Sequence, residues 1–126
     1  MIANLQILNF DRPRYNKTQR FKPSFYYNLL LQITMSPLSL PELSTGLQPL
    51  SHWQHRGDKL HREYKFPDFI TAFGFMTSMA LYSQASGHHP EWSNIYNRIT
   101  IELTTHDAGG ITQKDLDWAT KAETLI

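Results

Sequence analysis

The chain of 126 residues contains no cysteine, so it can form neither a disulfide framework nor a thiolate metal site, and it offers no cysteine nucleophile. It also lacks an apolar run of about 18 residues, the length that a transmembrane helix requires, and its mean hydropathy is negative. A transmembrane span is therefore excluded. The apolar share of 40% and the aromatic share of 13% exceed those of disordered chains. The composition thus predicts a soluble globular protein.

The chain has little net charge, +1, but this charge is unevenly distributed. Residues 1–34 contain five Lys/Arg and one Asp, which gives +4, whereas residues 35–126 contain seven Lys/Arg and ten Asp/Glu, which gives −3. Two domains within this length would each be too small for a self-supporting core, so we expect one domain at 35–126. Because that domain is acidic, we do not expect it to bind nucleic acid directly.

The first 34 residues show no sustained helical or strand periodicity, and we interpret them as a basic, disordered tail. Three explanations stay open: a targeting peptide, an interaction arm, or sequence translated upstream of a natural start at Met35. We expect a cytoplasmic protein without membrane contact, or an organellar one if residues 1–34 form a transit peptide.

Beyond the tail, the pattern predicts a short helix and a pair of strands. Leucines spaced mostly three and four residues apart indicate a helix that begins near Pro41 and is limited by Gly46 and Pro49. Residues 53–56 and 59–66 resemble two strands joined by a Gly-Asp turn. In the second strand, the residues of one face would be Leu60, Arg62, Tyr64 and Phe66, and those of the other face His61 and Lys65.

A long helix follows, for which Pro67 and Asp68 are start signals and Gly87 is the stop signal. Apolar residues inside it repeat at helical spacing, and we interpret this stripe as core. Its members are Phe69, Phe73, Met76 and Ala80, with Ala72, Phe75 and Met79 beside them.

A second pair of strands and a last helix complete the pattern. After a turn at residues 88–92, residues 98–104 alternate between polar and apolar side chains, as an antiparallel strand with one wet face does. Thr112, followed three residues later by Asp115, resembles a capping box that begins the final helix. The order α-β-β-α-β-β-α predicts an α+β fold, a small four-stranded antiparallel sheet with helices packed on one face.

Acid–base chemistry is most readily carried by the histidines, because an imidazole titrates near neutral pH. His88, His89 and His106 are flanked by turn residues rather than embedded in an apolar pattern, and loops on a rigid scaffold are where sites are built. The alternative is that these loop histidines are merely solvated. The other three, His52, His55 and His61, alternate with polar residues on the expected strands, and we expect them at the surface.

No metal motif accompanies these histidines. The chain has neither a His-x-x-x-His pair on a helix nor any cysteine, so zinc held by three imidazoles is only an alternative that the fold would have to assemble. A nucleophile elbow, a P-loop and a dinucleotide fingerprint are also missing. The spacing therefore argues little for a metal site, and no nucleotide-binding motif is present.

One set of residues carries a family resemblance. It consists of Ala72-Phe73-Gly74-Phe75-Met76-Thr77, His88-His89-Pro90-Glu91-Trp92, Asn94, Tyr96-Asn97, Thr104-Thr105-His106-Asp107, Gly110 and Asp115. An aromatic residue six positions after Pro90, a histidine ten positions later and an aspartate nine beyond that make the spacing distinctive. Over residues 38–126 the chain resembles pterin-4a-carbinolamine dehydratase, whereas the tail before Met35 has no counterpart in that family.

The resemblance implies dehydration of 4a-hydroxytetrahydrobiopterin, or a related pterin, to quinonoid dihydropterin and water. It implies no metal or organic cofactor, and a homodimer or homotetramer. His88 and His89 would be the acid and the base on opposite sides of the reacting centre, in an order left open, and His106 would complete the cluster. The residues implied in substrate binding are His88, His89, Pro90, Trp92, Thr105, His106, Asp107 and Ala108.

Three further positions have two interpretations or depart from the family. Trp92 would form a wall of the pocket, although core packing explains it equally well. Asp115 matches a family position near the site, and a capping role explains it at least as well. Gln84 stands where family members usually carry an acidic or otherwise charged residue. An amide can hydrogen-bond but cannot supply the negative charge that favours a charged imidazole, so we expect activity with a shifted pH optimum.

A different class of function competes with the enzyme. Relatives also serve as a dimerisation cofactor of a homeodomain transcription factor in animals, and as rubisco assembly factors. Such assembly factors tend to lose the catalytic residues, whereas all three histidines are present here. Site-first reasoning therefore favours the enzyme over a non-enzymatic protein-binding module.

Overall fold

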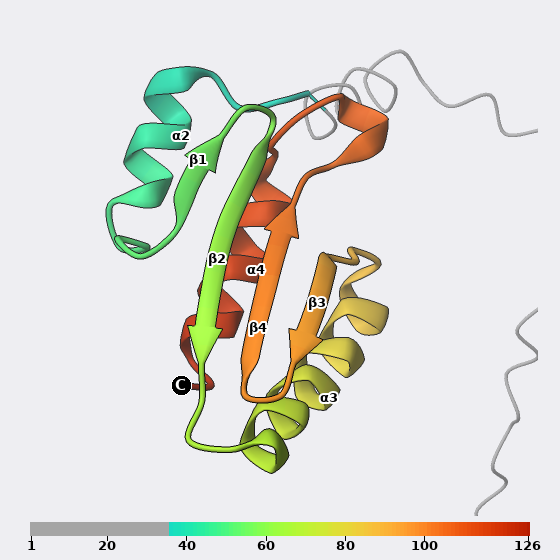
Figure 1. Cartoon of the computed structure of the whole chain (residues 1–126). Coiled ribbons are helices and arrows are strands. Elements are labelled where there is room, and N and C mark those ends of the chain that lie inside the picture. Colours follow the sequence, from blue (N-terminus) through green and yellow to red (C-terminus); the bar gives the residue numbers. More distant parts are fainter. Residues whose placement is uncertain (1–35) are drawn as a thin grey trace, which may run out of the picture.

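The computed structural model describes residues 36–126, so the expected tail lies outside the described residues. The helices and strands follow the predicted order α-β-β-α-β-β-α, which confirms the α+β fold (Figure 1). They are α2 (Leu40–Leu47), β1 (Gln54–Arg56), β2 (Lys59–Lys65), α3 (Phe69–Ser86), β3 (Glu91–Ile95), β4 (Arg98–Leu103) and α4 (Gln113–Glu123), with a 3-10 turn, η1, at His106–Ala108. In this described part of the chain, no helix is long and apolar enough to cross a bilayer.

The strands form one antiparallel sheet in the order β1-β2-β4-β3. Figure 1 shows α3 and α4 on the same side of this sheet, with α2 beside β1. The predicted alternation of β4 is confirmed, because Ile99, Ile101 and Leu103 are completely buried toward the helices. Each such side chain contributes roughly 1.5–3 kcal/mol by leaving water. Within residues 36–126, no helix lies on the opposite, outer face of the sheet (Figure 1), and most of the side chains on that face are polar.

The caps of α3 agree with the sequence signals. The helix begins after Asp68, whose carboxylate accepts a hydrogen bond of 2.7 Å from the amide of Thr71, and Pro67 precedes this cap rather than entering the first turn. Gly87 ends the helix in the left-handed region at φ 63°, a conformation that glycine adopts without strain. This end of the helix directs the following histidines out of the helix.

The predicted core stripe of α3 is only partly correct. Ala72, Phe75 and Met79 are buried, but Phe69 and Phe73 are exposed by 44% and 54%, and Ala80 is exposed as well. The buried row also includes the polar residue Ser83, whose hydroxyl donates to the carbonyl of Met79 and accepts from the indole of Trp118. Because apolar residues surround much of this helix, the packing against the sheet decides which row is buried, and spacing alone does not show it.

His61 departs from the expectation that it lies at the surface, although His52 and His55 are exposed as predicted. The side chain of His61 lies on the outer face of β2 and is only 7% exposed. Its ring nitrogens lie 3.6 Å from a carboxylate oxygen of Glu102 and 3.7 Å from one of Glu63, and they have no hydrogen-bond partner in the described structure. The alternation of strand residues placed the side chain on the correct face, but long neighbouring side chains bury it there.

Candidate active site

The three loop histidines line one cavity of about 270 Å³. Its lining residues are Gly87, His88, His89, Thr104, Thr105, His106, Asp107 and Lys114. Among the residues expected at the site, Pro90, Trp92 and Ala108 do not line this cavity. Trp92 packs edge-on against Trp118 at 6.1 Å between ring centroids, which is the core-packing arrangement.

Two chain reversals bring these histidines together. After α3, the amide of His88 donates to the carbonyl of Ser83, and the chain then turns into β3. After β4, Thr105 and Gly110 form an isolated bridge, and the residues between them make the 3-10 turn that carries His106. Since β3 and β4 are neighbours in the sheet, the start of one strand and the end of the other lie at the same sheet end.

His88 is held by a buried carboxylate. Its Nε2 lies 2.7 Å from Oδ1 of Asp115, a residue with no solvent exposure. Oδ2 of Asp115 accepts hydrogen bonds from the hydroxyl of Thr105 and from the amide of Thr112, at 2.8 and 2.7 Å. Because an ionised carboxylate only accepts hydrogen bonds, Nε2 of His88 carries a hydrogen. Asp115 therefore combines the capping contact with the support of a site histidine.

His89 and His106 are held more loosely. Nε2 of His89 lies 3.4 Å from Oε1 of Gln84, and a side-chain amide can face an imidazole with either its donor or its acceptor. Nε2 of His106 lies 3.2 Å from Oε1 of Glu91, in contact with a carboxylate once more, although the side chain of His106 is 75% exposed. Two of the three rings thus have a carboxylate partner.

Two residues of this region were not identified from the sequence as site residues. Glu91 directly follows the His-His-Pro segment, and its contact with His106 depends on the pairing of β3 with β4. Lys114 lines the cavity, and its ammonium group makes no ion pair with the residues that the structure describes. In the sequence, only its position next to Asp115 indicates that Lys114 lies at the site.

Ion pairs extend from Glu91 across the outer face of the sheet. The ammonium of Lys59 lies 2.7 Å from Oε2 of Glu91 and 3.0 Å from Oε2 of Glu102. Hydrogen bonds to these two carboxylates raise the pKa of Lys59 above its usual range. The hydrogen bond from Lys59 in turn lowers the pKa of Glu102. Both groups therefore stay charged at neutral pH.

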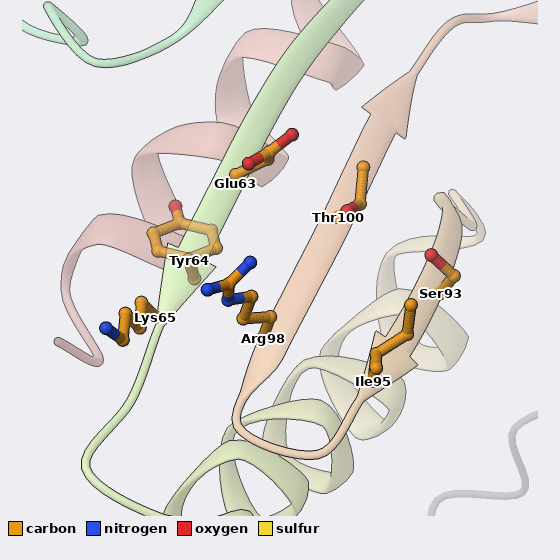
Figure 2. Close-up of a pocket in the computed structure, with 7 residues that line it drawn as sticks. All are labelled: Glu63, Tyr64, Lys65, Ser93, Ile95, Arg98 and Thr100. Atoms are coloured by element: carbon orange, nitrogen blue, oxygen red, sulfur yellow. The ribbon is translucent and has the colours of Figure 1, made fainter.

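A larger hollow of about 410 Å³ lies on the outer face of the sheet (Figure 2). Its lining residues are Glu63, Tyr64, Lys65, Ser93, Ile95, Arg98 and Thr100. None of these lining residues is a histidine, the side chain best suited to proton transfer near neutral pH. Acid–base chemistry at neutral pH therefore points to the smaller histidine cavity. Within residues 36–126, no three His, Asp or Glu side chains are arranged to hold a metal ion.

Comparison with known families agrees with the resemblance seen in the sequence. A family model described as pterin 4 alpha carbinolamine dehydratase matches residues 36–125. The chain belongs to this family. The match covers the whole α+β unit and all three cavity histidines.

The chain matches similar proteins over nearly their whole length. A protein from Solibacter usitatus, named provisionally as pterin-4-alpha-carbinolamine dehydratase, is 59% identical over 88 residues, which are 70% of this chain and 93% of that protein. A protein from Rhizorhabdus wittichii with the same provisional name is 44% identical over 95 residues, 74% of this chain and 98% of its own. A crystal structure from Brucella melitensis, described as a transcriptional coactivator/pterin dehydratase, has a TM-score of 0.69 at 40% identity and covers 71% of this chain and 98% of its own.

Proposed function

We propose that this dehydratase-family protein converts a 4a-hydroxytetrahydropterin, such as 4a-hydroxytetrahydrobiopterin, to quinonoid dihydropterin and water. The observation that carries the proposal is that His88, His89 and His106, from two separate loops, line a single cavity of about 270 Å³. The names of the relatives support the same reaction. The proposed reaction needs no metal and no organic cofactor, because every step is a proton transfer or the loss of water.

The reaction divides into two proton transfers. The hydroxyl oxygen on C4a receives a proton and departs as water, while N5 loses its proton and forms a double bond with C4a. One group must therefore act as an acid and another as a base, and each positioned transfer contributes about 10² to 10⁴ in rate. One histidine gives up a proton and its neighbour accepts one, so proton exchange with water restores the starting protonation state of both rings.

The contacts of each ring indicate which atom does this work. Since Nε2 of His88 faces Asp115, the working atom of His88 is Nδ1, in the manner of a histidine held by an aspartate in a catalytic triad. His89 faces only an amide, so its contacts do not fix one proton arrangement. We infer that His88 and His89 share the roles of acid and base, with His106 completing the cluster and the backbone of residues 105–107, which line the cavity, contacting the pterin.

A rate measurement tests the proposal. Chemically generated 4a-hydroxytetrahydropterin would be mixed with the wild type and with His88→Ala, His89→Ala and His106→Ala. We expect the wild type to exceed the uncatalysed rate and each variant to lose activity, with His52→Ala as an exposed control outside the cavity. A wild-type rate equal to the uncatalysed rate would refute the dehydratase proposal and favour a protein-binding function.

Binding of a protein partner, including a second copy of this chain, is the second candidate function. The observation in its favour is the exposed apolar surface of α3, which includes Phe69, Ile70, Phe73 and Leu81. Exposed apolar patches on soluble proteins commonly mark interaction sites. We propose that the protein is a homodimer or homotetramer and expect Phe73→Asp to lower the mass measured by light scattering. An unchanged mass would show that this face of α3 is not part of the oligomer interface.

A further inference from the structure

Glu91 connects the histidine cavity to the outer face of the sheet. Its Oε1 lies 3.2 Å from Nε2 of His106, and its Oε2 lies 2.7 Å from Nζ of Lys59. The two oxygens of one carboxylate thus have different partners, one in the cavity and one on β2. The backbone of Glu91 is fixed by the pairing of β3 with β4, where it stands opposite Glu102.

Lys59 holds the carboxylate of Glu91 from the side away from the cavity. Its ammonium also bonds Glu102 at 3.0 Å, so it spans from β2 across β4 to β3. The ammonium stays charged, because both carboxylates favour its protonated form. With Oε2 occupied by Lys59, Oε1 is the oxygen that Glu91 presents to His106.

This contact determines how the ring of His106 is presented. The contact is an ion-pair distance and not a hydrogen bond of good geometry, and a carboxylate, which only accepts hydrogen bonds, favours a hydrogen on the nitrogen that faces it. Nε2 is that nitrogen, and no hydrogen bond to Nδ1 is found in the described part of the chain. The side chain is 75% exposed, so packing does little to fix the ring. The carboxylate of Glu91 is therefore the contact that orients it.

We propose that Glu91 is a positioning residue, which holds the His106 ring with Nε2 protonated and Nδ1 open to the pterin, and that Lys59 holds Glu91 in place. The arrangement parallels the contact between His88 and Asp115, but it uses a partly exposed carboxylate on the strand instead of a buried one on a helix. Its kinetic consequences rest on the proposed dehydratase function, whereas the state of the ring is a property of the protein alone.

The kinetic test compares three replacements of outer-face glutamates. Glu91→Leu removes the acceptor, Glu91→Gln retains an acceptor oxygen, and Glu63→Leu is the matched control, because Glu63 lies near His61 and does not contact His106. We expect Glu91→Leu to lower kcat about tenfold through misplacement of the ring, with KM unchanged to within about twofold. Glu91→Gln should recover most of kcat, and Glu63→Leu should match the wild type.

Lys59→Met provides an independent variant, for which we expect a smaller loss of kcat, about threefold, because Glu91 remains but is held less firmly. A wild-type kcat in Glu91→Leu would overturn the proposal. A loss in Glu63→Leu as large as that in Glu91→Leu would also overturn it, since a general effect of charge on the sheet would then explain the result. The same holds for a Glu91→Gln variant as slow as Glu91→Leu.

Nuclear magnetic resonance of the histidine ring nitrogens separates this inference from the proposed function, because it needs no substrate. With the ring neutral, we expect the wild-type His106 signals to show a hydrogen on Nε2 and none on Nδ1. In Glu91→Leu the two nitrogen shifts should move toward each other as the second tautomer becomes populated. Identical shifts in both proteins would overturn the positioning role. A wild type without dehydratase activity but with a Glu91-dependent shift would refute the proposed function and support this inference.

Discussion

His88 and His106 line the same cavity, but the protein holds them by different means. The ring of His88 is buried and bonds a carboxylate that is itself completely buried among other donors. The ring of His106 is largely exposed and contacts a carboxylate that is 46% exposed. The first arrangement couples a site residue to the stability of the fold, and the second leaves the site residue almost independent of it. Substitutions at His88 should therefore affect both stability and activity, whereas substitutions at His106 should affect mainly activity.

The largest effect is expected for Asp115→Ala. The change removes the acceptor for His88, Thr105 and Thr112 at once, and each buried donor that is left without a partner costs about 1–3 kcal/mol of unfolding free energy. Urea unfolding measures this loss. Asp117→Ala is the matched control, because Asp117 is an exposed aspartate of the same helix whose side chain bonds Gln113 alone among the described residues. A loss no larger than that of the control would contradict the account of Asp115 as a shared anchor.

Alanine variants of His88 and His106 should both lose activity but should differ in stability. We expect His88→Ala to lower kcat by about 10² to 10⁴, as the loss of a positioned proton transfer does, and to lower stability because Asp115 loses its partner. His106→Ala should lower kcat with little effect on the melting temperature, since surface ion pairs contribute about 0–1 kcal/mol. Turnover and thermal unfolding of both variants measure the difference. Equal destabilisation by His88→Ala and His106→Ala would contradict the claim that only His88 is coupled to the stability of the fold.

A smaller change should make His89 resemble the other two histidines. Gln84→Glu places a carboxylate where the protein has an amide acceptor at 3.4 Å. A nearby negative charge favours the protonated imidazole, so we expect the pH optimum of the reaction to move to higher pH. The pH–rate profile measures the shift, with Gln48→Glu as a distant control. Profiles that superimpose would show that Gln84 does not tune the site.

The smallest effect is expected on the outer face, from Lys59→Met. The hydrogen bond from Lys59 lowers the folded-state pKa of Glu102 below its ordinary value of 4.5. Its contribution to stability is therefore fully present above that value and is lost as the pH falls through the lowered pKa. The melting temperature of Lys59→Met should lie slightly below that of the wild type at neutral pH, and this gap should shrink at an acidic pH below 4.5. A gap of equal size at both pH values would contradict this origin.

The elements of the fold were predictable because their signals are local. Asp68 and Gly87 bound α3 as expected, and the alternation around Ile101 fixes which face of β4 is buried. The exposure of Phe73 and the burial of His61 were not predictable, because each depends on which side chains the rest of the fold places opposite. An apolar residue on a helix can face the core or the solvent, and spacing within the helix does not distinguish the two.

The candidate site was predicted in part. The type and turn context of His88, His89 and His106 indicated acid–base chemistry, but their convergence on one cavity came from the family resemblance and not from their spacing. The capping pattern of Thr112 and Asp115 was visible locally, whereas the bond to His88 spans 27 positions. Glu91 was missed because its contact with His106 requires the turn after β4 to fold back beside β3.

The most direct test of the central claim follows all histidine rings at once during titration with a stable reduced pterin, such as 7,8-dihydrobiopterin, in protein labelled with nitrogen-15 at histidine. We predict that the signals of His88, His89 and His106 change together with one dissociation constant, while those of His52 and His55 stay unchanged. Saturable pterin binding that leaves the three cavity rings unchanged would contradict the claim that they share one substrate.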